Sequence, residues 1–299
     1  MTKNRTRRSI IVLVVLILLT IAAALVACVV GQVHATPHDV TNTILMSWGV
    51  KSDGTTPRIV TSTLWEVRFP RLVIALAVGA GLGCAGALLQ GIFANPLAEP
   101  SIIGVSSGGA VFASGLLAIA SLAGVERSYG FLKWGTALAA FIGALLTTLL
   151  VYSLSRVQGK TVVVNLILVG VAINAMAGGF VTLFSFIGGT MAQSQVVFWQ
   201  LGSLAGAGWS SAVITLIITV IGIVIACLCA PKMDLLALGE NQARHLGVNV
   251  ERFRLCVIIL VAALVGVGVA FAGVIAFVGL IVPHAIRLII GPQHKWLLP

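Results

Sequence analysis

The feature that most constrains this chain is a succession of long apolar runs that carry almost no charge. The run from Ile10 to Val30 has no charged residue, and comparable runs follow to the end of the sequence. Only 9% of the residues are charged, against about a quarter in ordinary soluble domains. A backbone in lipid must satisfy its own hydrogen bonds, so apolar runs of this length form membrane-spanning helices. We therefore predict an all-α, polytopic membrane protein.

Eight apolar segments define a single transmembrane domain over residues 1–299. The first follows a basic start but is about 21 residues long, which favours a membrane helix over a signal peptide. The last contains Pro283, His284 and Arg287, which favours a half-length helix surrounded by protein. We predict helices over residues 10–31, 70–90, 102–123, 132–154, 161–187, 211–230, 253–277 and 279–290.

Basic residues orient these segments, because Lys and Arg concentrate in cytoplasmic loops. With the N-terminus in the cytoplasm, twelve of the 18 Lys and Arg residues lie inside and six outside. This asymmetry also explains the net charge of +10 without nucleic acid, and no basic cluster is interleaved with aromatics. We predict a multi-pass protein of the plasma membrane, with lipid around it and a cytoplasmic N-terminus.

An internal repeat relates the second and seventh predicted helices. Six glycines, alanines and prolines recur at a constant spacing, and the two helices cross in opposite directions, as in the inverted repeats of many transporters. The first copy has Gly79, Gly81, Ala85, Gly86, Pro96 and Gly104, and the second has Gly266, Gly268, Ala272, Gly273, Pro283 and Gly291. A full second copy would extend beyond Pro299, so we expect the sequence to be C-terminally truncated, with about eight of ten helices present.

Five stretches resemble the permeases of ATP-binding-cassette (ABC) importers for iron–siderophore chelates, haem and vitamin B12. They are Arg68–Arg71 (RFPR), Gln90–Pro100 (QGIFANPLAEP), Ile103–Gly108 (IGVSSG), Leu235–Gly247 (LLALGENQARHLG) and Phe277–His284 (FVGLIVPH). The resemblance extends from about Leu64 to the end of the chain and is closest to the haem-importing branch. Members of this family have ten helices.

The segment 233–248 is too apolar for a free loop on the cytoplasmic side. Asp234 can cap a first short helix, and Gly239 and Gly247 can end two of them. The segment could rest on lipid, but its acidic and amide residues favour a protein partner. The resemblance implies that it couples to the ATPase subunit, through Asp234, Leu235, Leu236, Ala237, Leu238, Gly239, Glu240, Ala243, Arg244, His245, Leu246 and Gly247.

The resemblance also assigns roles near both ends of the helices. Arg68 and Arg71 would pair with glutamates of an external substrate-binding protein, although snorkelling at the membrane surface explains such arginines equally well. A cytoplasmic gate would involve Asn95, Pro96 and Leu97 opposite Val163 and Val164. A tight turn is the simpler interpretation of Asn-Pro, whereas two valines would make a dry closure.

The fifth predicted helix would line the translocation pathway with Asn165, Asn174 and Gly178. Such asparagines also serve as contacts between helices. Residues 198–204 (FWQLGSL) resemble the haem-importing branch, and the methionines and aromatics nearby suit a flat porphyrin. Haem is therefore the predicted ligand, with a ferric siderophore or cobalamin as the alternative.

The sequence shows no chemistry of its own. Gly159-Lys160-Thr161 lacks the first glycine of a phosphate-binding loop, which Leu154 replaces. The five cysteines have no metal-ligand spacing, and no predicted span carries a central acid for ion coupling, which leaves a secondary carrier as a remote alternative. We predict no catalytic residue, cofactor or metal, ATP and Mg²⁺ on two copies of a separate ATPase subunit, and a second copy of this permease.

Overall fold

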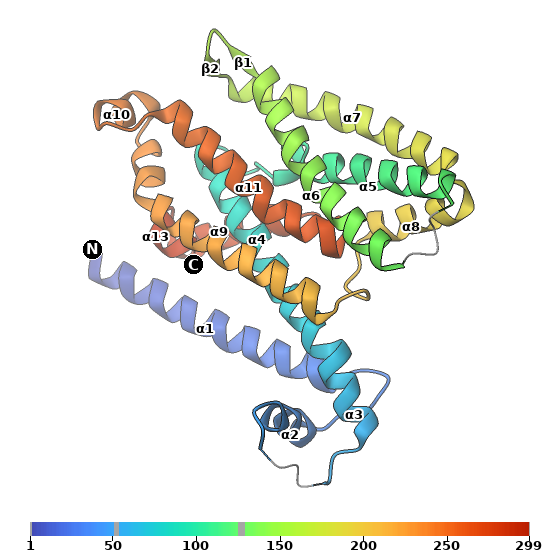
Figure 1. Cartoon of the computed structure of the whole chain (residues 1–299). Helices are drawn as coiled ribbons and strands as arrows, with labels where there is room; N and C mark the ends of the chain where they lie inside the picture. Colours follow the sequence, from blue (N-terminus) through green and yellow to red (C-terminus); the bar gives the residue numbers. More distant parts are fainter. Residues whose placement is uncertain (1, 51–53, 125–128, 299) are drawn as a thin grey trace. The chain divides into compact units, whose positions relative to one another are not determined.

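The computed structural model describes residues 2–50, 54–124 and 129–298, which are almost wholly helical (Figure 1). Seven helices in this part of the chain are long and apolar enough to cross a membrane. An eighth apolar helix, α12 (Val278–Ile290), is shorter and has the predicted half length. Its Gly279 and Pro283 are buried, but Ile281 and Leu288 are exposed, so protein covers only one of its faces. The polytopic, all-α fold is confirmed.

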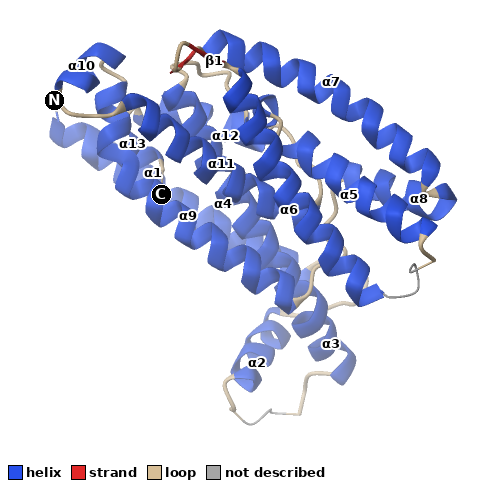
Figure 2. Ribbon diagram, turned by 45° about the horizontal axis from the view of Figure 1, so that its top comes forward, coloured by secondary structure: helices blue, strands red, loops and turns tan. Residues whose placement is uncertain are grey.

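The elements follow one another with short connections, and the described strands form one small hairpin (Figure 2). In chain order they are α1 (Thr2–Val29), α2 (Pro37–Ser47), α3 (Arg58–Thr63), the π-helix η1 (Leu64–Arg68), α4 (Phe69–Ile92), the 3₁₀-helix η2 (Pro100–Ile103), α5 (Val105–Leu122), α6 (Tyr129–Leu154), β1 (Arg156–Val157), β2 (Lys160–Thr161), α7 (Val163–Ile187), α8 (Gly189–Leu201), α9 (Trp209–Leu236), α10 (Glu240–His245), α11 (Val250–Ala272), α12 and α13 (His294–Leu297).

The chain divides into two compact units. The first comprises the residues up to Leu76 together with Leu204–Leu216, and the second comprises Ala77–Ser203 and the residues from Ile217 onward. In the first unit, Thr36 and Asp39 form a capping box that starts α2. Bonds from the Thr36 backbone and hydroxyl keep the pKa of the Asp39 carboxyl below its ordinary value. The core of this unit is small and apolar, formed by Cys28, Ala35, Val40, Val60, Leu64 and Phe69.

In the second unit α11 is one of the most buried helices and packs against α6 and α5. Small residues let the backbones approach closely. A Cβ built on Gly86 of α4 would lie 1.7 Å from the carbonyl oxygen of Gly279 in α12. That carbonyl has no partner four residues on, because Pro283 lacks an N–H. The absence of a side chain at Gly86 therefore fixes the spacing of α4 and α12.

The two copies of the predicted repeat differ in where their helices end. α4 continues past Gly86 to Ile92, whereas α11 ends at Ala272, before the corresponding Gly273. The predicted helix over 253–277 is therefore wrong beyond residue 272. Gly273 has a φ of 72°, which a helix cannot continue through, and Phe277 has a φ of 67°. Gly104 and Gly291 again correspond, since both have positive φ, 81° and 95°.

Gly86→Ala should destabilise the second unit by about 3 kcal/mol, because the methyl group would overlap the Gly279 carbonyl and push two helix backbones apart. Gly79→Ala is the matched control, since nothing lies within 4 Å of a Cβ at Gly79. Unfolding of the two purified variants in the same detergent measures the effect. Equal unfolding temperatures would contradict the close approach.

Candidate functional site

The segment between α9 and α11 contains one short helix, not the two that the sequence predicts. α9 continues to Leu236 because Met233 and Leu236 keep packing inside the second unit, where they are buried. Asp234 therefore lies within the last turn of α9 and does not cap a helix that follows it in the chain. The chain turns at Gly239, whose φ is 117°, and α10 then covers Glu240–His245. Gly247, with a φ of 86°, ends α10 as predicted.

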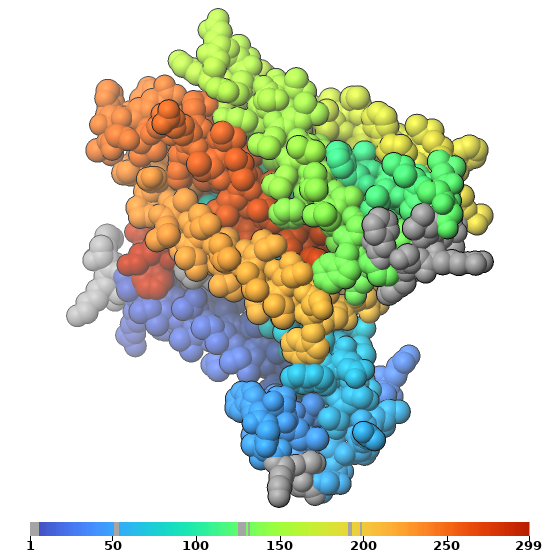
Figure 3. Space-filling model, in the orientation of Figure 1, coloured from blue at the N-terminus to red at the C-terminus, as the bar shows by residue number. Residues whose placement is uncertain are grey.

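Two leucines on either side of α10 are strongly exposed. Leu238 and Leu246 are each 61% exposed, whereas Leu236 is only 7% exposed. Arg244 and His245 are also exposed, and Ala243 is buried. Figure 3 shows α10 and the β1–β2 hairpin on the exterior of the second unit. Of the predicted coupling residues, Leu238, Arg244, His245 and Leu246 are thus available to a partner, while Leu236 and Ala243 anchor the segment.

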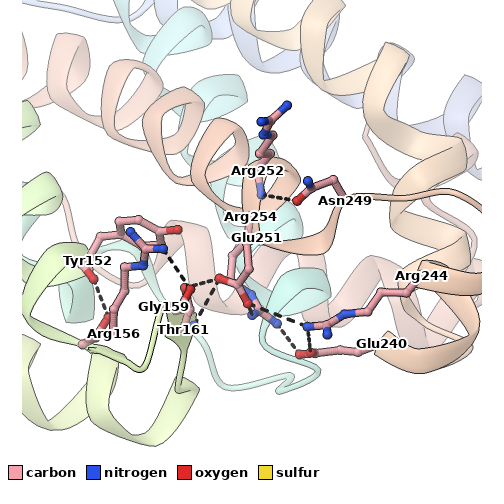
Figure 4. Close-up of polar contacts among 11 residues, drawn as sticks. Tyr152, Arg156, Gly159, Thr161, Glu240, Arg244, Asn249, Glu251, Arg252 and Arg254 are labelled. Atoms are coloured by element: carbon pink, nitrogen blue, oxygen red, sulfur yellow. Dashed lines mark hydrogen bonds and ion pairs between the residues drawn. The ribbon is translucent and has the colours of Figure 1, made fainter.

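A buried arginine fixes α10 to α11. The Arg254 side chain is 2% exposed, and its Nη2 lies 2.5 Å from Glu240 Oε1, at the start of α10 (Figure 4). Arg244, by contrast, is exposed and lies 3.7 Å from Glu240 Oε2. An exposed pair of this kind contributes at most about 1 kcal/mol, whereas a buried guanidinium that loses its partner destabilises by roughly 3 kcal/mol. The Arg254–Glu240 pair therefore holds α10 in place.

Glu251 connects this cluster to another part of the chain. Its Oε2 accepts bonds from the Thr161 backbone N–H, at 3.1 Å, and from the Thr161 hydroxyl, at 2.7 Å (Figure 4). Its Oε1 lies 3.6 Å from Arg254 Nη1. Thr161 ends β2, in a hairpin whose turn residues Gln158 and Gly159 both have positive φ, as tight hairpins require. Gly159 thus lies in a tight turn, as predicted, whereas Lys160 and Thr161 form β2.

A second anchor lies at the end of α9. The Asp234 carboxylate accepts bonds from the backbone N–H of His294, at 3.0 Å, and from its Nδ1, at 2.7 Å. His294 is 3% exposed, and its Nε2 has no hydrogen-bond partner among the described residues. Burial lowers the pKa of His294 below its ordinary value, and Asp234 only partly opposes this. Asp234 therefore holds the neutral ring of α13.

The two predicted docking arginines differ in their surroundings within the first unit. The Arg68 guanidinium donates to the carbonyls of Cys28, Val29 and Val33, so it caps the end of α1. Positive charge at the C-terminus of a helix also suits its dipole. Arg71 is exposed, and within the described part of the chain its guanidinium has no hydrogen-bond or ion-pair partner. Arg71 is thus free to bind an external carboxylate, and Arg68 is occupied.

The predicted gate residues lie in two separate local structures. Asn95 Oδ1 accepts a bond from the Leu97 N–H at 2.9 Å, so this stretch is a side-chain-stabilised turn. Leu97 is 65% exposed. Val163 and Val164 begin α7, directly after the hairpin, and Val164 is 64% exposed. Both places offer apolar side chains to a partner surface.

A cavity of about 360 Å³ in the second unit is lined in part by two of the three predicted pathway residues, Asn174 and Gly178. Asn165 is not among its lining residues. The Asn174 amide donates to the Ser101 carbonyl at 3.0 Å and accepts from the Ser107 hydroxyl at 2.6 Å. Asn174 therefore holds α7 to η2 and α5, as the alternative interpretation expected, and it also borders the cavity.

Sequence reasoning missed the residues that fix the candidate site, namely Thr161, Glu251, Arg254 and His294. Thr161 pairs with Glu251 and His294 with Asp234, both far away in the chain, and Arg254 pairs with Glu240 across the α10 segment. Glu251, Arg252 and Arg254 lie at the start of α11, and the remaining residues of this helix are uncharged. That placement was the one available indication, because ions at the edge of a membrane helix usually have partners.

Taken together, the membrane-crossing helices and the exposed α10 segment between two of them define a polytopic membrane protein. The chain belongs to the FecCD transport family, whose model matches residues 12–299.

Relatives with different ligands are similar to this chain to nearly the same degree. The haemin transport permease HmuU of Yersinia pestis is 37% identical over 238 residues, which are 79% of this chain and 70% of HmuU. The cobalamin import permease BtuC of Halobacterium salinarum is 39% identical over 233 residues, 78% of this chain and 60% of that protein. A chain of a metal-chelate-type ABC transporter, solved facing inward, has a TM-score of 0.78 at 30% identity, covering 96% of this chain and 84% of that one.

His294 predicts a pH dependence of stability. Because burial lowers its folded pKa below the unfolded value of 6.5, the unfolded chain binds the proton more readily. The stability that the neutral ring contributes is complete above pH 6.5 and is lost as pH falls through the folded pKa. The unfolding temperature of the wild type should therefore exceed that of His294→Gln most at pH 7.5, and the difference should shrink by pH 5.5. His245→Gln, at an exposed histidine of α10, is the control and should keep the wild-type profile.

Proposed function

We propose that this chain is the membrane subunit of an ABC importer for an iron chelate, with haem as its ligand, and that ATP hydrolysis on partner subunits drives it. The single observation that carries this proposal is the α10 segment. It presents two exposed leucines beside charged residues, and Arg254 holds it rigidly against α11. An apolar surface of this kind on a short helix suits the groove of a protein partner. The α10 end would face the cytoplasm.

Two ATPase subunits would bind the α10 segments of two permease copies. Closure of the ATPases on ATP would move α10. This movement would displace the turn after α4 and the start of α7, where the gate residues lie. Asn95, Pro96 and Leu97 would form one side of the cytoplasmic gate and Val163 and Val164 the other. Leu97 and Val164 are apolar and exposed, which supports a closure that excludes water. The chain itself would supply no catalytic group.

Leu238→Asp and Leu246→Asp should release the ATPase. Each leucine would lose about 2–3 kcal/mol of apolar burial, so binding should weaken roughly 30- to 150-fold. Copurification of the ATPase with the tagged permease measures this. Ile59→Asp, in α3 of the first unit, is a matched control because Ile59 is 65% exposed. An intact complex with either leucine variant would count against the proposal.

Arg71 would bind the external substrate-binding protein, while Arg68 would hold α1. Arg71→Glu should weaken docking about tenfold at low salt and reduce its salt dependence, because charge attraction is screened by ions. Arg58→Glu, an exposed change of the same charge, controls for net charge. Arg68→Glu should instead lower the unfolding temperature. The same loss of docking in Arg58→Glu as in Arg71→Glu would argue against a specific contact.

The relatives do not distinguish haem from cobalamin as the ligand, because a haemin permease and a cobalamin permease have similar sequence identities to this chain. Residues 198–204 and the exposed Met176 and Phe180 on α7 favour a flat aromatic ligand. Haemin uptake into proteoliposomes that contain the assembled importer, with cyanocobalamin and a ferric siderophore as competitors, would decide. Uptake of cyanocobalamin alone would exclude haem.

A further inference from the structure

One carboxylate connects the candidate docking segment to the start of α7. Glu251 stands in the first turn of α11, one turn before the buried Arg254. Its two oxygens face different partners: Oε2 accepts both bonds from Thr161, while Oε1 lies 3.6 Å from Arg254 Nη1 and 4.0 Å from Arg244 Nη2. Glu251 is therefore shared between the α10 cluster and the hairpin.

The Arg254 side of this arrangement is incompletely bonded. Its Nε and Nη1 are buried and have no hydrogen-bond partner among the described residues, although Nη2 is bonded to Glu240. Buried guanidinium groups normally use most of their donors. A movement of Glu251 that brings Oε1 into hydrogen-bond range of Nη1 would complete the pairing and would pull Oε2 away from Thr161. Arg254 and Thr161 therefore compete for the same carboxylate.

Thr161 lies two residues before the start of α7. The hairpin that ends there is short and tight, with Arg156 paired to Thr161 and Val162 N–H bonded to the Ser155 carbonyl at 3.4 Å. Such a structure has little freedom to absorb a displacement. A shift of Thr161 therefore moves Val163 and Val164.

We propose that Glu251 transmits the movement of α10 to the start of α7. Its carboxylate would bond to Thr161 in one arrangement and to Arg254 Nη1 in the other. Glu251, Thr161 and Arg254 are positioning residues, which act through the start of α7. The inference rests on the proposed function, because it assigns a route between the ATPase surface and the gate. Breaking the link should uncouple ATP hydrolysis from transport while leaving the complex assembled.

The test uses this chain in full, assembled with its ATPase subunits and binding protein in proteoliposomes. The measured quantity is the number of haemin molecules moved per ATP hydrolysed, with cyanocobalamin measured in parallel. Thr161→Val removes the hydroxyl and keeps the shape, and Glu251→Gln removes the charge. Both should lower the ratio at least about fivefold while ATP hydrolysis continues. Thr161→Ser, which keeps the hydroxyl, should restore it.

Thr148→Val is the matched control, because Thr148 is also buried and, among the described residues, its hydroxyl bonds only to the Ala144 carbonyl of its own helix, at 2.8 Å. The double variant Glu251→Gln/Thr161→Val should be no worse than Glu251→Gln alone, since both changes break one link. An unchanged ratio in Thr161→Val, additive effects, or loss of assembly in both single variants would overturn the inference. Failure of the proposed function would appear separately, as an ATPase that stays bound to Leu238→Asp.

Discussion

A backbone surrounded by lipid cannot leave its polar groups to water, and most of this structure follows from that constraint. Where a helix is continuous, the constraint is met within the helix. Where a helix ends or bends, side chains supply the missing partners. Arg68 donates to the carbonyls at the end of α1, Glu99 accepts the Phe277 N–H at 2.9 Å, and Gln90 donates to the Leu280 carbonyl at 3.1 Å. These side chains act at the end of α1 and around the break between α11 and α12.

The same constraint explains where the backbones come closest. Pro283 leaves the Gly279 carbonyl without its helical donor, and Gly86 of α4 lies directly against that carbonyl. A larger residue at position 86 would keep α4 away from α12 and expose the free carbonyl to lipid. The break between α11 and α12 and the glycine in α4 are therefore parts of one arrangement. The break in turn separates a long helix that begins at the α10 cluster from a short helix that carries Pro283.

Sequence patterns predicted the features that depend on the composition of a whole segment. Uncharged runs located the membrane helices, and leucines in a polar stretch located the α10 segment. The capping box of α2, formed by Thr36 and Asp39, is also a local pattern, because the two residues are three apart in the sequence. The cap assigned to Asp234 was wrong because the buried Met233 and Leu236 extend α9 past it. Pairings such as Thr161 with Glu251, or Asp234 with His294, depend on the three-dimensional packing of distant helices, and no local pattern encodes them.

The charged residues at the α10 end of the second unit do more than orient the chain in the membrane. Lys and Arg placed there by orientation alone would stay solvated and unpaired, as surface charges do. Instead Arg254 is buried, and the carboxylates of Glu240 and Glu251 lie within 4.0 Å of its guanidinium. Both carboxylates also lie within 4.0 Å of the guanidinium of Arg244. Burying an ion is costly, so it indicates a need for a fixed geometry more than for stability. The proposed coupling to a partner subunit would require that geometry, whereas a segment resting on lipid would not.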